Sequence, residues 1–358
     1  MKFVFTIHSH VTFLAALATI ELEKLEQSNV VIIANNYKIP FISNNKIVVV
    51  DSYDQEISKN SFFEKIRNFN YGKGSDKYIN RITKGCDYIA FIDLMSSFNR
   101  FLVTNPNCKQ FNFIEEGIVN YGNYDSFRLL TIDLDKFSWR LNYKNHLNEI
   151  IKSIVRILRG RSLKILNLPI QPNVYAFFKN VNFYGFSELA FPNIPSQKKK
   201  NISFDSISVP RNLLKELKRD IDLENSFILI GDSMCTHYNI SMEHFKMALD
   251  KMLSKIKPIE AKKIFVKLKG SESKEEVSVI MSSLKKFNFE INFLEQDIIM
   301  ELVFLSHNNL TVLGNGSSLL VYSKLMNHHT YSLFYDLPDV YNIPLANDYD
   351  SVKNLLKG

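Results

Sequence analysis

The sequence opens with Lys2-Phe3-Val4-Phe5-Thr6-Ile7, a short apolar run that predicts a buried β-strand. A second apolar run at residues 11–20 ends in a charged stretch and predicts the helix that follows this strand. A strand followed by a helix is the repeating unit of α/β folds. The beginning of the chain therefore favours a parallel sheet covered by helices.

The same alternation continues along the chain. Short runs rich in β-branched and aromatic residues predict strands at 30–34, 46–51, 88–92 and 110–114, with helices at 12–26, 61–69 and 96–103. The second half predicts strands at 227–230, 263–267, 291–294, 310–313 and 331–334, and helices at 241–256, 275–287, 298–305, 319–326 and 350–356. We therefore expect two doubly wound, Rossmann-like α/β domains facing each other across a cleft.

A polar stretch with two prolines separates the halves. Pro192, Pro195 and the run Lys198-Lys199-Lys200 are typical of a linker. The predicted division is a first domain at residues 1–195, a linker at 196–206 and a second domain at 207–358. Ligands of such sheets bind beyond the carboxyl ends of the strands, where the loops considered below lie.

Composition limits the classes of function. The 358 residues are 46% hydrophobic and 23% charged, which is enough apolar material for two cores. Cys86, Cys108 and Cys235 are odd in number and scattered, as is typical of a reducing compartment. Since no apolar run approaches the roughly 20 residues of a membrane span, we expect a cytoplasmic protein.

The net charge of +7 is concentrated in a few segments. Basic and apolar residues are interleaved over 152–166, which fits a helix on an anionic membrane and equally a docked helix with a solvated basic face. The expected membrane contact is therefore peripheral, at the inner face of a bacterial inner membrane. The run at 198–200 lacks interleaved aromatic residues, so nucleic acid is a weak candidate partner.

Two adjacent carboxylates, Glu115 and Glu116, follow the predicted strand at 110–114 and precede Gly117. Like charges side by side raise each other's pKa, and one of them can then act as a base near neutral pH. Taken alone, the pair is better explained as two surface acids at a solvated turn. The other motifs favour the catalytic interpretation.

The turn Gly314-Asn315-Gly316-Ser317-Ser318 joins a predicted strand to a predicted helix. Amides and hydroxyls at the start of a helix bind anions, and a helix needs only one cap. Two glycines and two serines therefore favour a phosphate site. Lys267 and Lys269 lie at the end of the strand at 263–267, where a cation could neutralise a leaving phosphate or face solvent.

The remaining candidates are weaker. Glu301 could accept hydrogen bonds from ribose hydroxyls, although locally a surface acid explains it better. His8 and His10 follow the first strand, where either could hold an acceptor sugar. The histidines show no metal-ligand spacing, and Asp133-Leu134-Asp135 lies in a polar connecting stretch, so no metal is expected.

The order of these motifs resembles the bacterial sialyltransferases and polysialyltransferases of the GT-B type. Residues 113–121, Phe-Ile-Glu-Glu-Gly-Ile-Val-Asn-Tyr, look like the family's acidic-acidic-Gly motif with its trailing tyrosine. Residues 264–272 occupy the place of the family's Lys-Pro-His-Pro segment, and residues 316–322 look like its phosphate-binding serine motif. The resemblance extends over roughly residues 110–335, and more loosely over the first strand and helix.

The resemblance implies an inverting, metal-independent transfer of sialic acid from CMP-sialic acid to a sugar hydroxyl, in the synthesis of bacterial capsule, lipooligosaccharide or lipopolysaccharide. It implies that Glu116 is the base, with Glu115 orienting it or raising its pKa, and that His10 and Tyr121 contact the acceptor. The donor-binding residues would be Ser317, Ser318, Gly316, Glu301, Lys267 and Gly231. The expected partners are a CMP-activated sugar and an oligosaccharide or glycolipid acceptor, with no cofactor.

One departure concerns the family's His-Pro pair, which is absent. Leu268-Lys269-Gly270 stands in its place, so Lys269 falls where the family's histidine stabilises the departing phosphate. A lysine supplies positive charge but is a poorer proton donor at neutral pH. Three alternatives stay open: a different donor such as CMP-Kdo, another sugar-nucleotide enzyme such as a 2-epimerase, and a non-catalytic subunit of a polysaccharide assembly complex.

Overall fold

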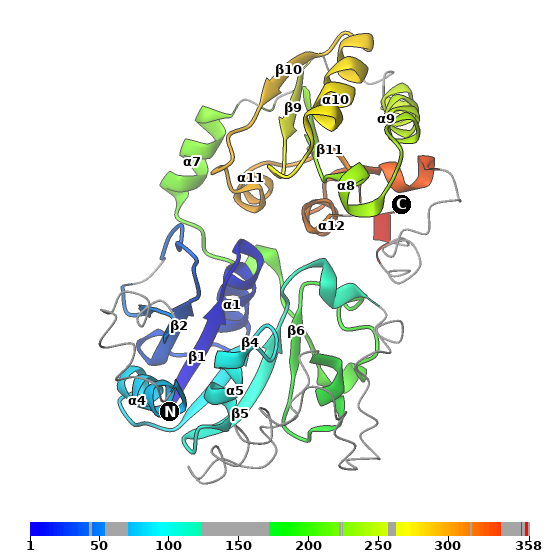
Figure 1. Cartoon of the computed structure of the whole chain (residues 1–358). Coiled ribbons are helices and arrows are strands. Elements are labelled where there is room, and N and C mark those ends of the chain that lie inside the picture. Colours follow the sequence, from blue (N-terminus) through cyan, green and yellow to red (C-terminus); the bar gives the residue numbers. More distant parts are fainter. Residues whose placement is uncertain are drawn as a thin grey trace, which may run out of the picture. The chain divides into compact units, whose positions relative to one another are not determined.

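The structure is a computed structural model that describes residues 1–42, 45–53, 71–122, 172–221, 223, 225–256, 263–315, 317–337, 352 and 355–356. The chain divides into two compact units. Unit 1 comprises Met1–Glu116 and Tyr124–Ser208, and unit 2 comprises Gly117–Asn123 and Val209–Gly358. Each unit is built on one parallel sheet (Figure 1).

The sheet of unit 1 has seven strands in the order β3-β2-β1-β4-β5-β6-β7. In chain order they are β1 (Lys2–Ile7), β2 (Val30–Ala34), β3 (Val48–Asp51), β4 (Tyr88–Ile92), β5 (Cys108–Ile114), β6 (Phe183–Gly185) and β7 (Lys199–Asn201). The chain runs outward from β1 to β3, returns to β4 on the other side of β1 and continues to β7. The strand order therefore reverses between β1 and β4, and in doubly wound sheets this reversal is where ligands bind.

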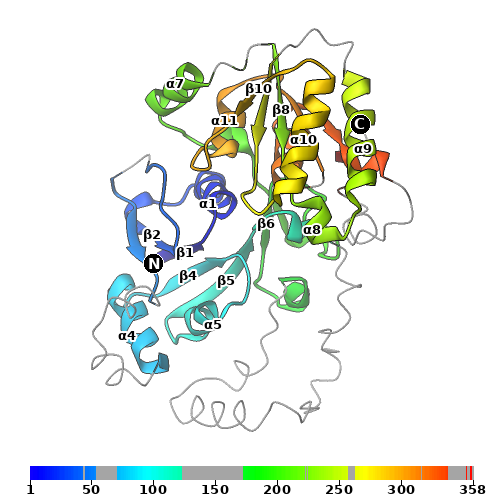
Figure 2. The same ribbon diagram turned by 45° about the horizontal axis from the view of Figure 1, so that its top comes forward.

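Helices cover both faces of this sheet: α1 (His10–Leu22) lies on one, and α4 (Tyr71–Thr83) and α5 (Ser97–Thr104) lie on the other (Figure 2). Right-handed connections that run in opposite directions across a sheet produce this arrangement. Helix α1 is apolar on every side, and its residues from Val11 to Ile20 are all buried. Its position against β1 and β5 is therefore set by the core.

The sheet of unit 2 has five parallel strands in the order β10-β9-β8-β11-β12. They are β8 (Ser226–Ile230), β9 (Lys263–Lys267), β10 (Glu290–Phe293), β11 (Thr311–Gly314) and β12 (His329–Ser332). The strand order reverses between β8 and β11, so the expected ligand position is at the carboxyl ends of these two strands.

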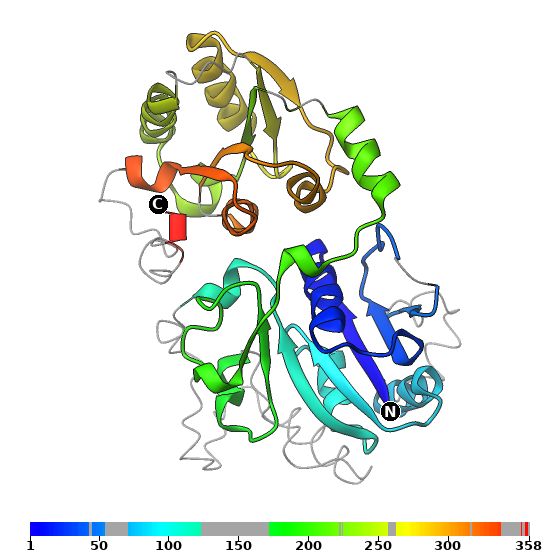
Figure 3. The same ribbon diagram turned by 180° about the vertical axis from the view of Figure 1, so that it is seen from behind.

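The helices of unit 2 form two groups. Helices α9 (Met242–Ile256) and α10 (Lys274–Lys286) pack together on one face of the sheet, and α11 (Met300–Ser306) and α12 (Ser318–Leu325) pack together on the other (Figures 1 and 3). Helix α7 (Arg211–Asp220) packs on α11, and α8 (Met234–Tyr238) precedes α9. The described 3-10 turns are η1 (Gln27–Asn29), η2 (Ile118–Tyr121), η7 (Pro172–Phe177), η8 (Ser196–Lys198), η9 (Phe204–Ser206) and η10 (Leu333–Asp336).

Every predicted strand overlaps an observed one, but β6, β7, α4, α7 and α8 were not predicted. The predicted linker at 196–206 is corrected, because Lys199–Asn201 forms β7 at the edge of the first sheet. An edge strand leaves polar side chains in solvent, so its sequence looks like a linker. The division between the units falls instead after Ser208.

Several predicted features lie outside the described residues. They are the helix at 61–69, the sequence Asp133-Leu134-Asp135, the basic segment at 152–166, Gly316 and most of the terminal helix at 350–356. In the part of the chain that the structure describes, no helix combines the length and the hydropathy that crossing a bilayer requires.

Candidate active site

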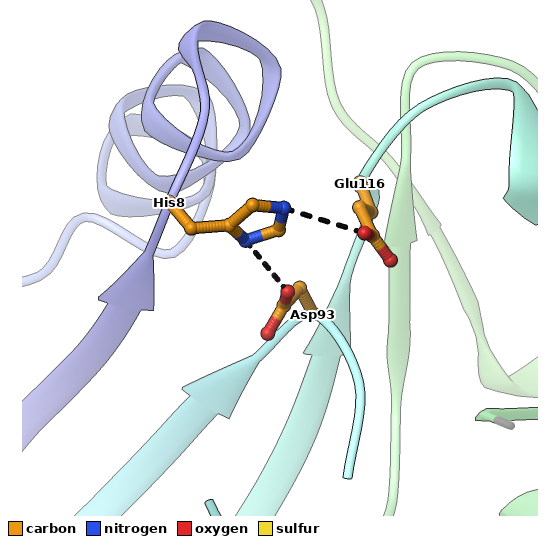
Figure 4. Close-up of side chains that lie close together, drawn as sticks. All are labelled: His8, Asp93 and Glu116. Carbon is orange, nitrogen blue, oxygen red and sulfur yellow. Dashed lines mark ion pairs between the residues drawn. The ribbon is translucent and has the colours of Figure 1, made fainter. Parts of the chain in front are cut away.

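The candidate site of unit 1 lies at the carboxyl ends of β1, β4 and β5, where His8, Asp93 and Glu116 come together (Figure 4). The Nδ1 atom of His8 is 2.8 Å from Asp93 Oδ2, and its Nε2 atom is 3.3 Å from Glu116 Oε1. One imidazole ring therefore bridges two carboxylates. To donate a hydrogen bond from each nitrogen, the ring must be protonated.

The two carboxylates raise the pKa of His8 from 6.5 to about 10. The hydrogen bond to Asp93 has the largest effect and the one to Glu116 the next, while burial of the ring opposes both. His8 is therefore an imidazolium at neutral pH. It can orient a carboxylate and stabilise its charge, but it does not accept a proton.

Local hydrogen bonds hold both His8 and Asp93 in position beside Glu116. The backbone amides of His8 and Ser9 donate to the buried Oγ1 of Thr12, at 3.1 and 3.0 Å, which holds the turn from β1 into α1. Asp93 Oδ1 accepts from Asn99 Nδ2 at 3.2 Å, and the same amide donates to the carbonyl of Leu94. The His8 ring is therefore held by the start of α1, and the Asp93 carboxylate by the start of α5.

Glu115 lies on the other side of the strand end, since successive residues of an extended strand face opposite ways. Its side chain is fully buried, and its Oε2 atom accepts from the amide of Phe186 at 2.7 Å. Glu115 therefore joins the end of β5 to the residue that follows β6. The predicted effect of Glu115 on the pKa of Glu116 stays a prediction.

The two predicted acceptor residues are His10 and Tyr121. His10 Nδ1 is 2.6 Å from the Tyr37 hydroxyl, and the two rings meet edge to face. Tyr121 is fully buried in η2, in the short segment that clusters with unit 2, and its contact with the acceptor stays a prediction. Asp93 was not predicted, although it directly follows the predicted strand at 88–92 and this position was a usable signal.

In unit 2, the serine turn has two distinct roles. Ser317 Oγ caps α12 by accepting from the amide of Leu320 at 3.4 Å, which is the capping role considered for this turn. Ser318 Oγ accepts from the amide of Ile118 at 3.2 Å, and Ile118 belongs to the short segment that clusters with unit 2. Gly117 precedes it with a φ of +152°, a conformation that essentially only glycine adopts.

Lys267 and Glu301 are both buried charged groups of unit 2. Burial lowers the pKa of Lys267, whose ammonium donates to the carbonyl of Glu295. Burial raises the pKa of Glu301 to about 7, and the charge of Lys267 opposes this shift. The buried Glu301 carboxyl lowers the folding stability of the free protein, and such a group is a candidate for ligand binding.

Lys269 and Gly231 lie at the carboxyl ends of β9 and β8. Lys269 Nζ is 3.2 Å from Asp232 Oδ1, so its charge is already paired. A side chain at Gly231 would place its Cβ 2.6 Å from Glu272 Oε1, and this carboxylate accepts from the amides of Lys269 and Gly270 at 2.8 Å each. Gly231 therefore allows β8 to approach the loop that carries Lys269.

Among the described residues, His8, Asp93 and Glu116 form the one group whose ligand atoms could hold a metal ion, and these atoms lie within 4.8 Å of one another. The two nitrogens of the His8 ring face different carboxylates, however, so one ion cannot replace both contacts. The arrangement fits a hydrogen-bonded chain better than a metal centre. That the protein needs no metal stays a prediction.

The comparisons with known proteins agree with this architecture. The family model for alpha-2,8-polysialyltransferase matches residues 3–334. A comparison with curated proteins gives no match. A 2,6-sialyltransferase from Photobacterium sp. JT-ISH-224, solved with the donor product CMP and the acceptor lactose, has a TM-score of 0.50 and 12% identity over 99% of this chain and 76% of that chain.

Two further solved structures are similar at lower scores. A sialyltransferase from Photobacterium damsela has a TM-score of 0.48 and 12% identity, over 90% of this chain and 71% of that one. The ADP-heptose lps heptosyltransferase II of E. coli has a TM-score of 0.45 and 9% identity, over 92% and 83%. With the two parallel sheets, the similarity to the Photobacterium sp. enzyme confirms the predicted GT-B fold class.

We expect Glu115→Ala to lower the free energy of unfolding by about 1–3 kcal/mol, because it leaves the buried amide of Phe186 without its acceptor. Glu116→Ala removes a partly exposed ion pair and should cost less than about 1 kcal/mol. Urea unfolding followed by circular dichroism measures both values. Equal losses in the two variants would contradict the structural role of Glu115.

We expect His8→Asn to remove a pH-dependent part of the stability. Because the pKa of His8 is raised on folding, its stabilisation is fully present below pH 6.5 and is lost as the pH rises through about 10. The advantage of the wild type over His8→Asn should therefore shrink between neutral pH and about pH 10 in urea unfolding. His329→Asn, at an exposed position, serves as the control. If the free energy of unfolding changes with pH in the same way in wild type and His8→Asn, the ion pairs of His8 with Asp93 and Glu116 would be refuted.

Proposed function

The chain belongs to the alpha-2,8-polysialyltransferase family and is a glycosyltransferase, and from this premise we propose that it moves sialic acid, or a related nonulosonic acid, from a CMP-activated donor to a sugar hydroxyl. The observation that carries the proposal is the position of Glu116 at the end of β5, in contact with His8 at the reversal of strand order. A carboxylate there is placed to accept the proton of a bound hydroxyl.

In the proposed reaction, the acceptor hydroxyl oxygen attacks the anomeric carbon of the donor sugar while its proton passes to Glu116. The bond between that carbon and the phosphate oxygen breaks, and CMP leaves with the bonding electron pair. One displacement of this kind inverts the configuration of the anomeric carbon. His8, being already protonated, donates to Glu116 Oε1 and fixes the orientation of the base.

We assign the donor to residues of unit 2. The hydroxyls of Ser317 and Ser318 at the start of α12 are proposed to hold the phosphate, since the first turn of a helix favours anions. Lys269 is proposed to supply positive charge to the leaving group, in competition with its partner Asp232. Glu301 is proposed to accept hydrogen bonds from the ribose hydroxyls.

The proposal extends to the partners and the pathway. CMP and lactose, the ligands of the Photobacterium sp. enzyme, represent the two classes of molecule that we expect this chain to bind. We place the reaction in the synthesis of bacterial surface polysaccharide or lipooligosaccharide, at the cytoplasmic side of the inner membrane and without a metal.

Glu116→Gln is expected to reduce transfer by at least about 100-fold, because a general base contributes at least this factor, while CMP still binds. The measurement is release of CMP from CMP-sialic acid across a panel of sugar acceptors in buffer containing EDTA. CMP affinity is followed by thermal shift. The exposed Glu188→Gln of unit 1 is the control, and unchanged turnover in Glu116→Gln would remove Glu116 from the mechanism.

Glu301→Gln is expected to stabilise the free protein at pH 8 by about 1–3 kcal/mol and to have little effect at pH 5. Between pH 4.5 and about 7 the folded protein binds more protons than the unfolded chain, so stability falls as the pH rises through this range. The same variant should weaken CMP binding by about 10-fold, since hydrogen bonds to a charged group are lost. Urea unfolding at both pH values and CMP titration measure the two effects.

The exposed Glu290→Gln on β10 is the matched control for Glu301→Gln. A variant at Glu301 that gains stability but keeps full CMP affinity would exclude this residue from the donor site. If Glu301→Gln gains no stability at pH 8, this would contradict the raised pKa of the buried Glu301 carboxyl.

A further inference from the structure

A cavity of about 300 Å³ lies in unit 1 between β6, β7 and the connection that joins these two strands. A connection between neighbouring parallel strands is usually a helix that covers the sheet. Residues 186–198 form this connection, and the structure described there contains the 3-10 turn η8 and no α-helix. A loop of this kind leaves part of the sheet uncovered, and the cavity occupies that place.

The cavity lies on one face of β6. Phe183 and Gly185 line it, whereas Tyr184 between them points to the opposite face, because side chains alternate along a strand. The hydroxyl of Tyr184 donates to Oε1 of Glu23, at the end of α1, at 2.9 Å. The cavity is therefore on the face of β6 that is turned away from α1, and its described lining includes no residue of the candidate active site.

The floor of the cavity is apolar. It is formed by Phe183, Ala190, Phe191 and Ile194, each at most 4% exposed. The rings of Phe183 and Phe191 meet edge to face, with 5.4 Å between their centroids. Phe191 has a φ of +53°, a backbone conformation that a bulky residue rarely adopts and that costs free energy. Such strain is concentrated at ligand sites, and here it places an aromatic ring on the floor of the cavity.

Two cations of β7, Lys199 and Lys200, also line the cavity. The Lys199 ammonium donates to the backbone carbonyl of Glu188 at 2.9 Å, and burial lowers its pKa. In the described part of the chain, no carboxylate lies within 4.0 Å of either ammonium group. Glu188 is the one acid of the described lining, and the nearby Glu115 carboxylate is fully buried. The lining therefore carries a net positive charge.

Lysines on an edge strand often serve only to prevent pairing with another chain, and they then extend into solvent. Lys200 fits this description, but Lys199 is half-buried beside the apolar floor. A buried cation is costly unless an anion pairs with it. Lys199 therefore favours a ligand that brings a negative charge into the cavity.

We propose that this cavity binds an organic phosphate, with the phosphate group on the two lysines and the carbon atoms of the ligand on the apolar floor. A phosphate carries more charge than a carboxylate and accepts several hydrogen bonds, so it suits two ammonium groups. Since a water molecule occupies about 30 Å³ in the liquid, the cavity has room for about ten water-sized groups, which is the size of glycerol phosphate. The site is independent of the proposed transfer reaction, because it uses other residues.

Calorimetric titration of the full chain compares glycerol phosphate with inorganic phosphate. We expect glycerol phosphate to bind about 10-fold more tightly, because its carbon atoms bury apolar surface on the floor. Saturating CMP should leave this affinity unchanged, since the proposed donor residues belong to unit 2. Equal affinity for the two phosphates, or displacement of glycerol phosphate by CMP, would overturn the proposal.

Co-sedimentation with vesicles distinguishes two sources of this ligand, a free phosphate ester and a membrane lipid. Vesicles of phosphatidylglycerol present a glycerol phosphate headgroup, and vesicles of phosphatidylcholine carry no net charge and serve as the control. Binding to phosphatidylglycerol that Lys199→Gln weakens would assign the site to a lipid headgroup. Binding of glycerol phosphate without binding of vesicles would assign it to a free ester, and absence of both would overturn the proposal.

Variants of the lining locate the site. Lys199→Gln is expected to weaken binding of glycerol phosphate by about 10-fold, and Lys200→Gln, at an exposed position, by about 3-fold. Glu188→Gln should strengthen binding by about 2-fold, because it removes the acid of the lining. Lys77→Gln, at an exposed position of α4, is the matched control. Circular dichroism verifies the fold of each variant.

Equal effects of Lys77→Gln and Lys200→Gln would show that only the general surface charge attracts the anion, and this would overturn the site. Unchanged affinity in both Lys199→Gln and Lys200→Gln would also overturn it. If Lys199→Gln does not fold, Lys200→Gln and Glu188→Gln decide, since both act at exposed positions. Release of CMP with soluble acceptors should be unchanged in Lys200→Gln, so failure of this site and failure of the proposed function are measured separately.

Discussion

The candidate site of unit 1 depends on the single imidazole ring that lies between two carboxylates. Strands β1, β4 and β5 are neighbours in a parallel sheet, so the residues that follow them meet at one edge. Without the charge of His8, Asp93 and Glu116 would oppose each other there. The protonated ring binds both, and the contacts of Thr12 and Asn99 hold that arrangement in place.

Most of the fold could be predicted because central strands of a parallel sheet are continuously apolar, as in β1, β2 and β8. The inner strand β6 and the edge strand β7 could not, since each has three residues and is too short to carry a periodic signal. The importance of Asp93 depends on the strand order. Local sequence does not reveal that β4, and not β3, lies next to β1.

The acidic motif shows why a match of residues does not assign their roles. Glu115 and Glu116 are adjacent in sequence, yet the alternation of an extended chain sends one to a buried backbone amide and the other to His8. The next position in the chain has a φ of +152°, which essentially only glycine adopts, and Gly117 occupies it. The serine turn is similar, since Ser317 caps a helix while Ser318 accepts from a different segment.

The two units share one electrostatic feature, a cation paired with an aspartate at the ends of neighbouring strands. In unit 1 the His8 cation stays between carboxylates, and its raised pKa leaves a carboxylate as the group that can accept a proton. In unit 2 the Lys269 cation is more exposed and pairs with one aspartate, Asp232, at 3.2 Å. A phosphate carries more negative charge than one carboxylate, so a bound donor would compete with Asp232 for this lysine. In the proposed reaction, Lys269 therefore supplies charge to the leaving group and not a proton.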